Sequence, residues 1–345
     1  MLTSNDTGPS NQPAGDRCRC REDSGNRGSA VNSGLLSRIA ETLFWTGRYV
    51  ERADDTARMV DVYVHRLLEE PRVSEDTDCR ALLSVLGIPA PAGVPMDVGA
   101  TVYELAYHAK SPSAITGAVL AARAGARSVR DVISSEMWEC LNVTGLGLPA
   151  QRRTAERLGP HIFLRYIRER AALFFGLADS TMSHDDAWRF LVLGRSLERV
   201  DMTARLLLTR MPDTPQQVGW PMLLRACGAY ESFIRNRGWP GGRDDAAEFL
   251  ILDRLFPRSV LYSLGIAEEC LAALDPAAGR AGMADPARRT IGALRTRLEY
   301  SHTDLPPDQL SELLGSLQEA CMQASEAIAE RYFSYAQPVA WASGG

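Results

Sequence analysis

Apolar residues recur every three or four positions along most of this chain, which is the spacing of helices with one buried face. No segment of useful length alternates apolar and polar residues in the way of a half-buried strand. Short connections between the periodic runs favour antiparallel neighbouring helices. The pattern therefore predicts an all-α fold, a multi-helix bundle with helices at residues 35–69, 76–86, 101–109, 113–141, 154–181, 185–210, 222–235, 246–256, 259–274, 286–302 and 307–334.

Segments rich in Pro and Gly predict two loops within the bundle, GIPAPAGVPMDVG at 87–99 and NVTGLGLP at 142–149. Residues 1–34 are mainly Ser, Gly, Asn, Pro and charged residues, so they cannot bury enough apolar surface to offset their ordering entropy. We therefore expect a disordered N-terminal tail at 1–34, a helical domain at 35–336 and a short flexible C-terminal tail at 337–345.

The most distinctive feature is a string of residues that occurs twice. GRYVERADDTARM runs from Gly47 to Met59, and GRSLERVDMTARL runs from Gly194 to Leu206. The copies lie 147 residues apart, which is too long for the period of a solenoid. Each copy lies in a long predicted helix, and the two halves do not align outside the strings. We therefore expect two pseudo-equivalent long helices rather than a duplicated domain.

On a helix, each string separates an apolar face from a polar face. The apolar faces are predicted to enter the core and comprise Val50, Ala53, Ala57 and Val60 in the first copy and Leu197, Val200, Ala204 and Leu207 or Leu208 in the second. A glycine inside a helix costs about 1 kcal/mol relative to alanine, so Gly47 and Gly194 indicate the close approach of another helix or of a ligand. The candidate site residues on the polar faces are Arg48, Glu51, Arg52, Asp54, Arg58, Arg195, Glu198, Arg199, Asp201 and Arg205.

Three hypotheses account for the polar faces. In the first, arginines and carboxylates of the two helices pair across a buried interface and fix the register of the bundle. In the second, the same charges bind a partner surface or a zwitterionic, peptide-like ligand. In the third, the space between the two helices is the active site of an enzyme whose reaction the sequence does not define.

Other patterns of catalytic or metal-binding residues are weak. A di-metal carboxylate centre needs a Glu-x-x-His motif on each of two further helices, and the chain has one, at Glu299–His302. The five histidines are scattered, and spacing assembles no Ser-His-Asp or Cys-His pair. The sequence therefore predicts no metal site and no cofactor, and it identifies no catalytic residue.

Composition narrows the class of protein further. The net charge of −5 gives no basic excess of the kind that nucleic-acid binding requires. The seven cysteines are odd in number and are not spaced like a disulfide framework, which favours reduced thiols. No apolar run approaches the ~18 residues of a membrane span. We expect a cytoplasmic protein with no nucleic-acid and no membrane partner.

The repeated Glu-Arg string resembles the signature of the Alpha-E domain family, an all-α domain named for its Glu-Arg motif. The resemblance extends from about Leu35 to Ser334. Its landmarks are LLSRIAETLFWTGRYVERADDTARMVDV at 35–62, SSEMWECLN at 134–142, FFGLADSTMSHDDAWRFLVLGRSLERVDMTARLL at 174–207 and FLILDRLFPRSVLYSL at 249–264.

The resemblance implies partners as well as a fold. Members of this family are typically encoded beside, or fused to, a circularly permuted ATP-grasp protein and a transglutaminase-like cysteine peptidase, which implies a system that makes or remodels peptide or amide bonds. The resemblance transfers no catalytic residue, and the Glu-Arg pairs carry over only as motif positions. We expect an accessory helical protein whose duplicated face is a polar centre for a partner or a peptide-like ligand. An enzyme and a purely structural charge network are the alternatives.

Overall fold

The computed structural model describes residues 37–69, 75–90, 93–208, 219–237, 243–275, 285–301 and 307–333. The predicted tails at 1–34 and 337–345 lie outside the described residues. The helices belong to one compact unit, and none of the described residues forms a β-strand. The elements are α1 (Ser37–Glu69), α2 (Glu75–Val85), α3 (Val98–Val102), the π-helical turn η1 (Tyr103–Tyr107), α4 (Ile115–Ser128), α5 (Ser135–Leu158), α6 (His161–Thr181), α7 (Asp186–Leu208), α8 (Trp220–Ala226), α9 (Tyr230–Arg237), α10 (Arg243–Leu252), α11 (Val260–Leu274), α12 (Pro286–Glu299), α13 (Pro307–Ile328) and the π-helical turn η2 (Ala329–Phe333).

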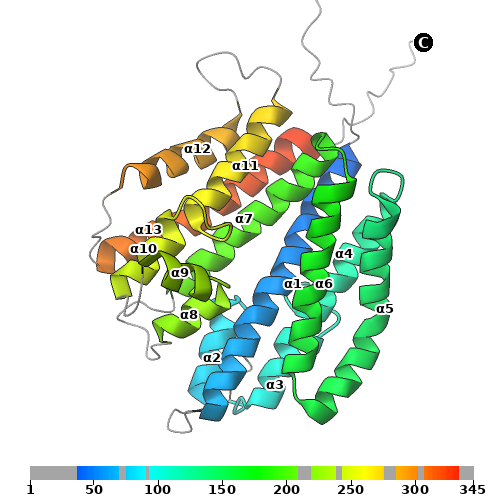
Figure 1. Cartoon of the computed structure of the whole chain (residues 1–345), viewed down its shortest axis with the longest axis vertical. Coiled ribbons are helices and arrows are strands. Elements are labelled where there is room, and N and C mark those ends of the chain that lie inside the picture. Colours follow the sequence, from blue (N-terminus) through cyan, green and yellow to red (C-terminus); the bar gives the residue numbers. More distant parts are fainter. Residues whose placement is uncertain are drawn as a thin grey trace, which may run out of the picture. The chain divides into compact units, whose positions relative to one another are not determined.

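The helices α1 and α7, which carry the two strings, pack along each other at the centre of the bundle (Figure 1). On one side, α4 and α6 pack against α1, and α5 packs against both of them. On the other side, α11 and α13 flank α7, and α12 packs on this pair. The prediction of an all-α bundle with two long motif helices is therefore confirmed.

The predicted apolar faces of the two strings are buried, since their residues expose at most 4% of their surface, except Leu208, which is partly buried. Phe44 of α1 and Phe190 of α7 both contact Phe333 of η2, with ring centroids 5.5 and 6.1 Å apart. The last described turn of the chain therefore packs over the contact between α1 and α7. In the described part of the chain, no helix combines the length and the apolar character that crossing a membrane requires.

The predicted loop at 142–149 is wrong, because these residues lie inside α5. A Cβ atom added at Gly145 would lie 2.6 Å from Cδ of Arg123, and one added at Gly147 would lie 2.8 Å from the hydroxyl oxygen of Tyr166. The two glycines therefore let side chains of the neighbouring helices approach α5, and they do not reverse the chain.

Besides the helix expected at 222–235, which is divided into α8 and α9, two long predicted helices are each divided. The helix expected at 113–141 is interrupted before Ser134, whose hydroxyl accepts a hydrogen bond of 3.2 Å from the backbone N–H of Met137 and caps α5. The helix expected at 154–181 is interrupted at Gly159, whose φ of 102° favours glycine. Apolar periodicity continues through both breaks, so periodicity alone does not locate them.

The cysteines within the described residues are all buried free thiols: Cys79, Cys140, Cys227, Cys270 and Cys321. Burial raises the pKa of Cys227, Cys270 and Cys321 to about 12. Such thiols are unreactive at neutral pH, which agrees with the reduced thiols expected from the sequence. Cys18 and Cys20 lie outside the described residues.

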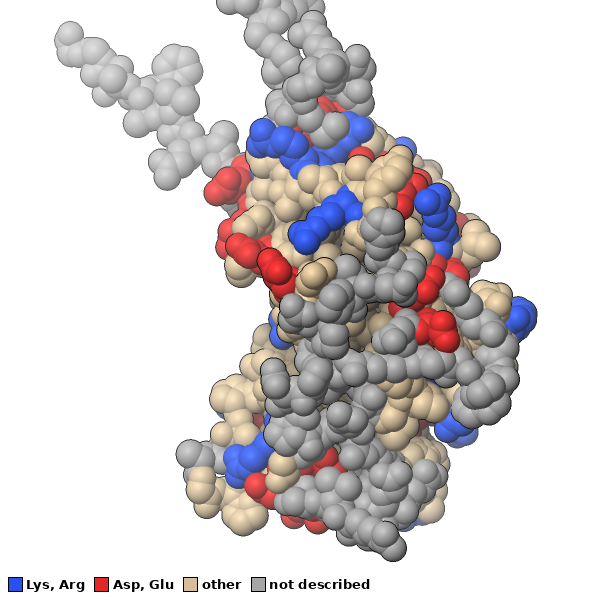
Figure 2. Space-filling model, turned by 90° about the vertical axis from the view of Figure 1, so that its left-hand side faces the viewer, with Lys and Arg blue, Asp and Glu red and all other residues tan. Residues whose placement is uncertain are grey.

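The charged surface is mixed in sign on the face drawn in Figure 2, where basic and acidic side chains are interspersed. This distribution accompanies a net charge of −5 over the whole chain.

Candidate functional site

The helices α1 and α7 cross at Gly47 and Gly194. A Cβ atom added at Gly47 would overlap the backbone carbonyl oxygen of Leu191, and one added at Gly194 would overlap that of Phe44. Leu191 precedes Gly194 by three residues, as Phe44 precedes Gly47. The contact is therefore reciprocal, and the two strings are related by a local pseudo-two-fold axis. Only glycine lets two backbones come this close, so the glycines serve the approach of another helix.

Glu198 of α7 is held by two arginines of α1. Nε of Arg48 lies 2.8 Å from Oε2 of Glu198, while Nε of Arg52 lies 2.5 Å from Oε1. Arg48 also donates a hydrogen bond of 2.9 Å to the hydroxyl of Ser325 on α13, and its guanidinium lies 5.5 Å from the ring centre of Trp45. Glu198 exposes none of its surface, so both of its carboxylate oxygens are used inside the bundle.

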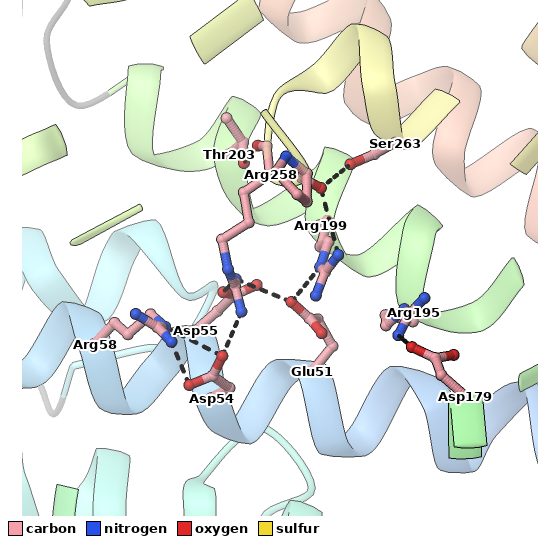
Figure 3. Close-up of polar contacts among 11 residues, drawn as sticks. Glu51, Asp54, Asp55, Arg58, Asp179, Arg195, Arg199, Thr203, Arg258 and Ser263 are labelled. Atoms are coloured by element: carbon pink, nitrogen blue, oxygen red, sulfur yellow. Dashed lines mark hydrogen bonds and ion pairs between the residues drawn. The ribbon is translucent and has the colours of Figure 1, made fainter. Parts of the chain in front are cut away.

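Glu51 occupies the equivalent position on α1 and is also fully buried. It accepts a hydrogen bond of 2.6 Å from Nε of Arg199 on α7 (Figure 3). Its second cation is Arg258, which lies two residues before α11 and places Nη1 2.9 Å from Oε1. Oε2 of Glu51 is buried and has no hydrogen-bond partner among the described residues. The Glu51 half is therefore less completely satisfied than the Glu198 half.

Each string also contains an Asp-Arg pair one helical turn apart. Nε of Arg58 lies 3.1 Å from the carboxylate of Asp54, and Nε of Arg205 lies 2.8 Å from the carboxylate of Asp201. These ion pairs lie within α1 and α7, so the last arginine of each string contacts an aspartate of its own helix.

Arg195 breaks the pseudo-symmetry. By position it corresponds to Arg48, but its closest carboxylate is that of Asp179, 3.7 Å away and half-exposed. Its guanidinium lies 4.8 Å from the ring centre of Phe175, and its buried Nε has no hydrogen-bond partner among the described residues. Burial, reinforced by the positive charge of Arg199, lowers the pKa of Arg195. Arg258, and not Arg195, is therefore the second arginine that pairs with Glu51.

Arg258 and Asp55 are site residues that the sequence analysis missed. The guanidinium of Arg258 donates hydrogen bonds to the carboxylates of Asp54 and Asp55 in addition to its ion pair with Glu51 (Figure 3). The segment before α11 is held in place because Nη1 of Arg199 donates to the carbonyl of Pro257 at 3.3 Å. Arg258 lies within the landmark at 249–264, but nothing in the sequence spacing pairs it with the strings.

The site thus comprises the ten predicted residues together with Asp55 and Arg258, and we call this set the Glu-Arg centre. Nine of the ten predicted residues make ion pairs of 3.1 Å or less within it, and Arg195 is the exception. The centre joins α1, α7 and the start of α11. Its geometry therefore holds three segments that are far apart in the sequence.

The buried carboxylates of the centre have opposite pKa shifts. Burial by itself would raise the pKa of Glu51 and Glu198, but the paired guanidinium groups outweigh it and hold both pKa values below the ordinary range. Burial raises the pKa of Asp55 to about 7, and the negative charges of Glu51 and Asp54 reinforce the rise while Arg258 opposes it. The two glutamates are therefore ionised at neutral pH, whereas Asp55 exchanges its proton near neutrality.

One group of carboxylates in the described part of the chain is close enough to share a metal ion. Oxygen atoms of Glu51, Asp54 and Asp55 lie within 4.8 Å of one another. Arg258 forms ion pairs with all three, so its guanidinium takes the position that a bound cation would need. In the described part of the chain, the three carboxylates therefore fit the guanidinium of Arg258 better than a metal ion.

The comparison with protein families identifies the class of this fold and centre. The Alpha-E family, described as "a predicted alpha-helical domain with a conserved ER motif", matches residues 35–333. The chain therefore belongs to the Alpha-E family, and the Glu-Arg pairs at its centre are Glu51–Arg52 and Glu198–Arg199.

Similar curated proteins include the uncharacterized proteins Mb2597 of Mycobacterium bovis and Rv2567 of Mycobacterium tuberculosis. Each is 27% identical over 304 residues, a match that covers 80% of this chain and 33% of the relative. The chain thus spans about a third of the length of these relatives. No solved structure matches the chain.

Proposed function

We propose that this Alpha-E protein is an accessory, non-catalytic helical component of a system that forms peptide or amide bonds. In this proposal it works in the cytoplasm beside a circularly permuted ATP-grasp protein and a transglutaminase-like protein. The non-catalytic part of this proposal rests on the pairing of Glu51 and Glu198, each with an arginine of the opposite helix. Neither glutamate exposes any surface.

Glu198 is not available to a partner or a substrate. A carboxylate that binds a partner or a substrate must be reached from solvent, and its hydrogen-bonding positions must be free. Glu198 meets neither condition, because two guanidinium groups occupy both of its oxygens. The geometry therefore supports a charge network that fixes α1 against α7. Breaking a buried ion pair of this kind costs several kcal/mol, which is enough to define one register of the bundle.

The partners are proposed on two grounds. The first is the family resemblance, which implies an ATP-grasp protein and a transglutaminase-like protein. The second is the length of the mycobacterial relatives, of which this chain matches about a third, as expected of a module that works beside other protein modules. A polar centre that itself binds a partner or a peptide-like ligand remains a prediction for the ten motif residues.

A specific observation favours the enzyme alternative at one residue. Burial and neighbouring carboxylates raise the pKa of Asp55 to about 7, and a group that titrates near the operating pH is suited to general acid-base work. In this alternative, Asp55 and the unpaired Oε2 of Glu51 would face a substrate that displaces Arg258.

The experiment is co-purification and amide-ligase assay with the proposed partner, a circularly permuted ATP-grasp protein. It compares the wild type with Glu51→Gln/Glu198→Gln and with the control Glu139→Gln/Glu326→Gln, which removes two exposed carboxylates. The proposal expects the first variant to melt at a lower temperature, yet to bind the partner and support ligation like the wild type below that temperature.

Two results would contradict the proposal. Loss of the complex by a folded Glu51→Gln/Glu198→Gln protein, with the control intact, would assign the centre to partner or ligand binding. Amide-bond formation by the Alpha-E chain without the ATP-grasp protein would establish the enzyme alternative.

A further inference from the structure

A second polar site lies between α1 and α6, outside the Glu-Arg centre. It is a cleft with a volume of about 450 Å³, which lies within the 300–1,000 Å³ typical of small-ligand sites. The lining residues of α1 lie three and then four positions apart. Those of α6 lie four, three, one and three positions apart, so each helix contributes one face. The lining residues are Arg58, Asp61, His65, His161, Arg165, Arg168, Glu169 and Ala172.

The cleft carries more positive than negative charge. Three arginines and two histidines face two carboxylates. The two arginines of α6 are also loosely paired, because Arg168 lies 3.3 Å from Asp61 and Arg165 lies 3.8 Å from Glu169. In the Glu-Arg centre the arginines lie 2.5–2.9 Å from the two glutamates. Guanidinium groups in the cleft are therefore available to a further anion.

Two polar atoms at the buried side of the cleft have no hydrogen-bond partner among the described residues. They are Nε of Arg168, a donor, and Oδ1 of Asp61, an acceptor. The Asp61 oxygen lies 3.7 Å from Nδ1 of His65. Buried polar atoms in folded proteins are nearly always hydrogen-bonded, so the unpaired N–H of Arg168 indicates a group that the protein itself does not supply.

Arg58 connects the cleft to the Glu-Arg centre. Its Nε donates to Asp54, and Asp54 in turn is bound by Arg258. The guanidinium also packs on Gly228, where an added Cβ would lie 2.9 Å from Nη1. One wall of the cleft is therefore fixed in position by buried contacts, which lowers the entropic cost of binding a ligand there.

We propose that this cleft binds a small anionic ligand through a carboxylate or phosphate group, held by Arg165, Arg168 and Arg58. Guanidinium groups bind both kinds of oxyanion through paired N–H donors. The site shares Arg58 with the Glu-Arg centre, and its other lining residues lie outside that centre. It does not depend on the proposed accessory role.

The test is calorimetric titration of the full chain with three probes: inorganic phosphate, the dipeptide Ala-Ala and its C-terminal amide. Saturable binding of phosphate assigns a phosphate ligand, and binding of Ala-Ala but not of its amide assigns a carboxylate. The variant Arg165→Gln/Arg168→Gln is expected to lower the affinity for the probe that binds at least 10-fold. Ala172→Phe, which fills the cleft and keeps its charges, is expected to lower this affinity similarly.

The matched control is Arg153→Gln/Arg157→Gln, which removes two exposed arginines from α5 and changes the net charge by the same amount. Its affinity should stay within twofold of the wild type. Equal weakening by both double variants would show general charge attraction only and would overturn the proposal. The absence of saturable binding for all three probes would also overturn it.

Discussion

Gly47 and Gly194 each lie against the backbone of the opposite motif helix. A Cβ atom at Gly47 would overlap the carbonyl oxygen of Leu191, three residues before Gly194, and a Cβ atom at Gly194 would overlap that of Phe44, three residues before Gly47. Gly47→Ala and Gly194→Ala should therefore force α1 and α7 apart and destabilise the protein by about 2 kcal/mol or more, as overpacking does. Urea denaturation measures this change in the free energy of unfolding.

The control for this prediction uses Gly265 of α11 and Gly315 of α13, where an added Cβ would meet nothing within 4 Å. Gly265→Ala and Gly315→Ala should stabilise the protein by about 0.5–1 kcal/mol, because alanine is the better helix former. Stabilisation by Gly47→Ala as well would show that α1 and α7 do not pack as described.

Arg48 and Arg195 have equivalent sequence positions but different contacts, so the same substitution should have different effects. Arg48→Met leaves buried Glu198 with one arginine and should cost about 3 kcal/mol, as expected for a broken buried pair. Arg195→Met removes a buried cation whose closest carboxylate is 3.7 Å away and should change stability by less than ~1 kcal/mol. Chemical denaturation distinguishes the two, and equal losses would contradict the asymmetric centre.

The raised pKa of Asp55 predicts a pH dependence of stability. An aspartate titrates near 3.9 in an unfolded chain and at about 7 here, so between these values the folded state binds a proton that the unfolded state does not. Its contribution to stability is full below about pH 4 and is lost as the pH rises to about 7. Asp55→Asn, which keeps the neutral form, should match the wild type below about pH 4 and be more stable than the wild type at pH 8.

The measurement for Asp55 is the difference between the melting temperatures of the variant and the wild type across this range. The difference removes the opposite trend of Glu51 and Glu198, whose lowered pKa values make the protein lose stability as the pH falls. A difference that does not depend on pH would show that Asp55 titrates normally.

Arg258 should be the most sensitive position outside the two strings. Arg258→Met leaves three neighbouring buried carboxylates without their shared cation and should cost about 3–5 kcal/mol. If the guanidinium occupies a place that a cation could take, Ca²⁺ or Mn²⁺ should raise the melting temperature of Arg258→Met and leave that of the wild type unchanged. Arg254→Met, which removes an exposed neighbour, controls for the loss of charge and should respond to neither ion.

The sequence by itself determined the helices, the two motif helices and their buried faces. Periodicity is a local property, and the apolar positions of each string can enter the core in one way only. The glycines were equally informative where the helix continues around them, since a costly residue inside a helix indicates close packing. The same residue type misled at 142–149, because a glycine that admits a neighbouring side chain and a glycine that ends a helix look alike in a single sequence.

Tertiary structure alone decided which charges pair. Arg48 and Arg195 occupy equivalent positions of the two strings, but Arg195 contacts Phe175 and Asp179 of α6 and does not pair with Glu51. Arg258 enters from a segment about 200 residues further along the chain than Glu51, and the facing residues of α1 and α6 meet only after folding. Pairing across helices depends on distances of a few ångströms in three dimensions, because Coulomb energy and hydrogen-bond geometry act through space and leave no fixed spacing along the chain.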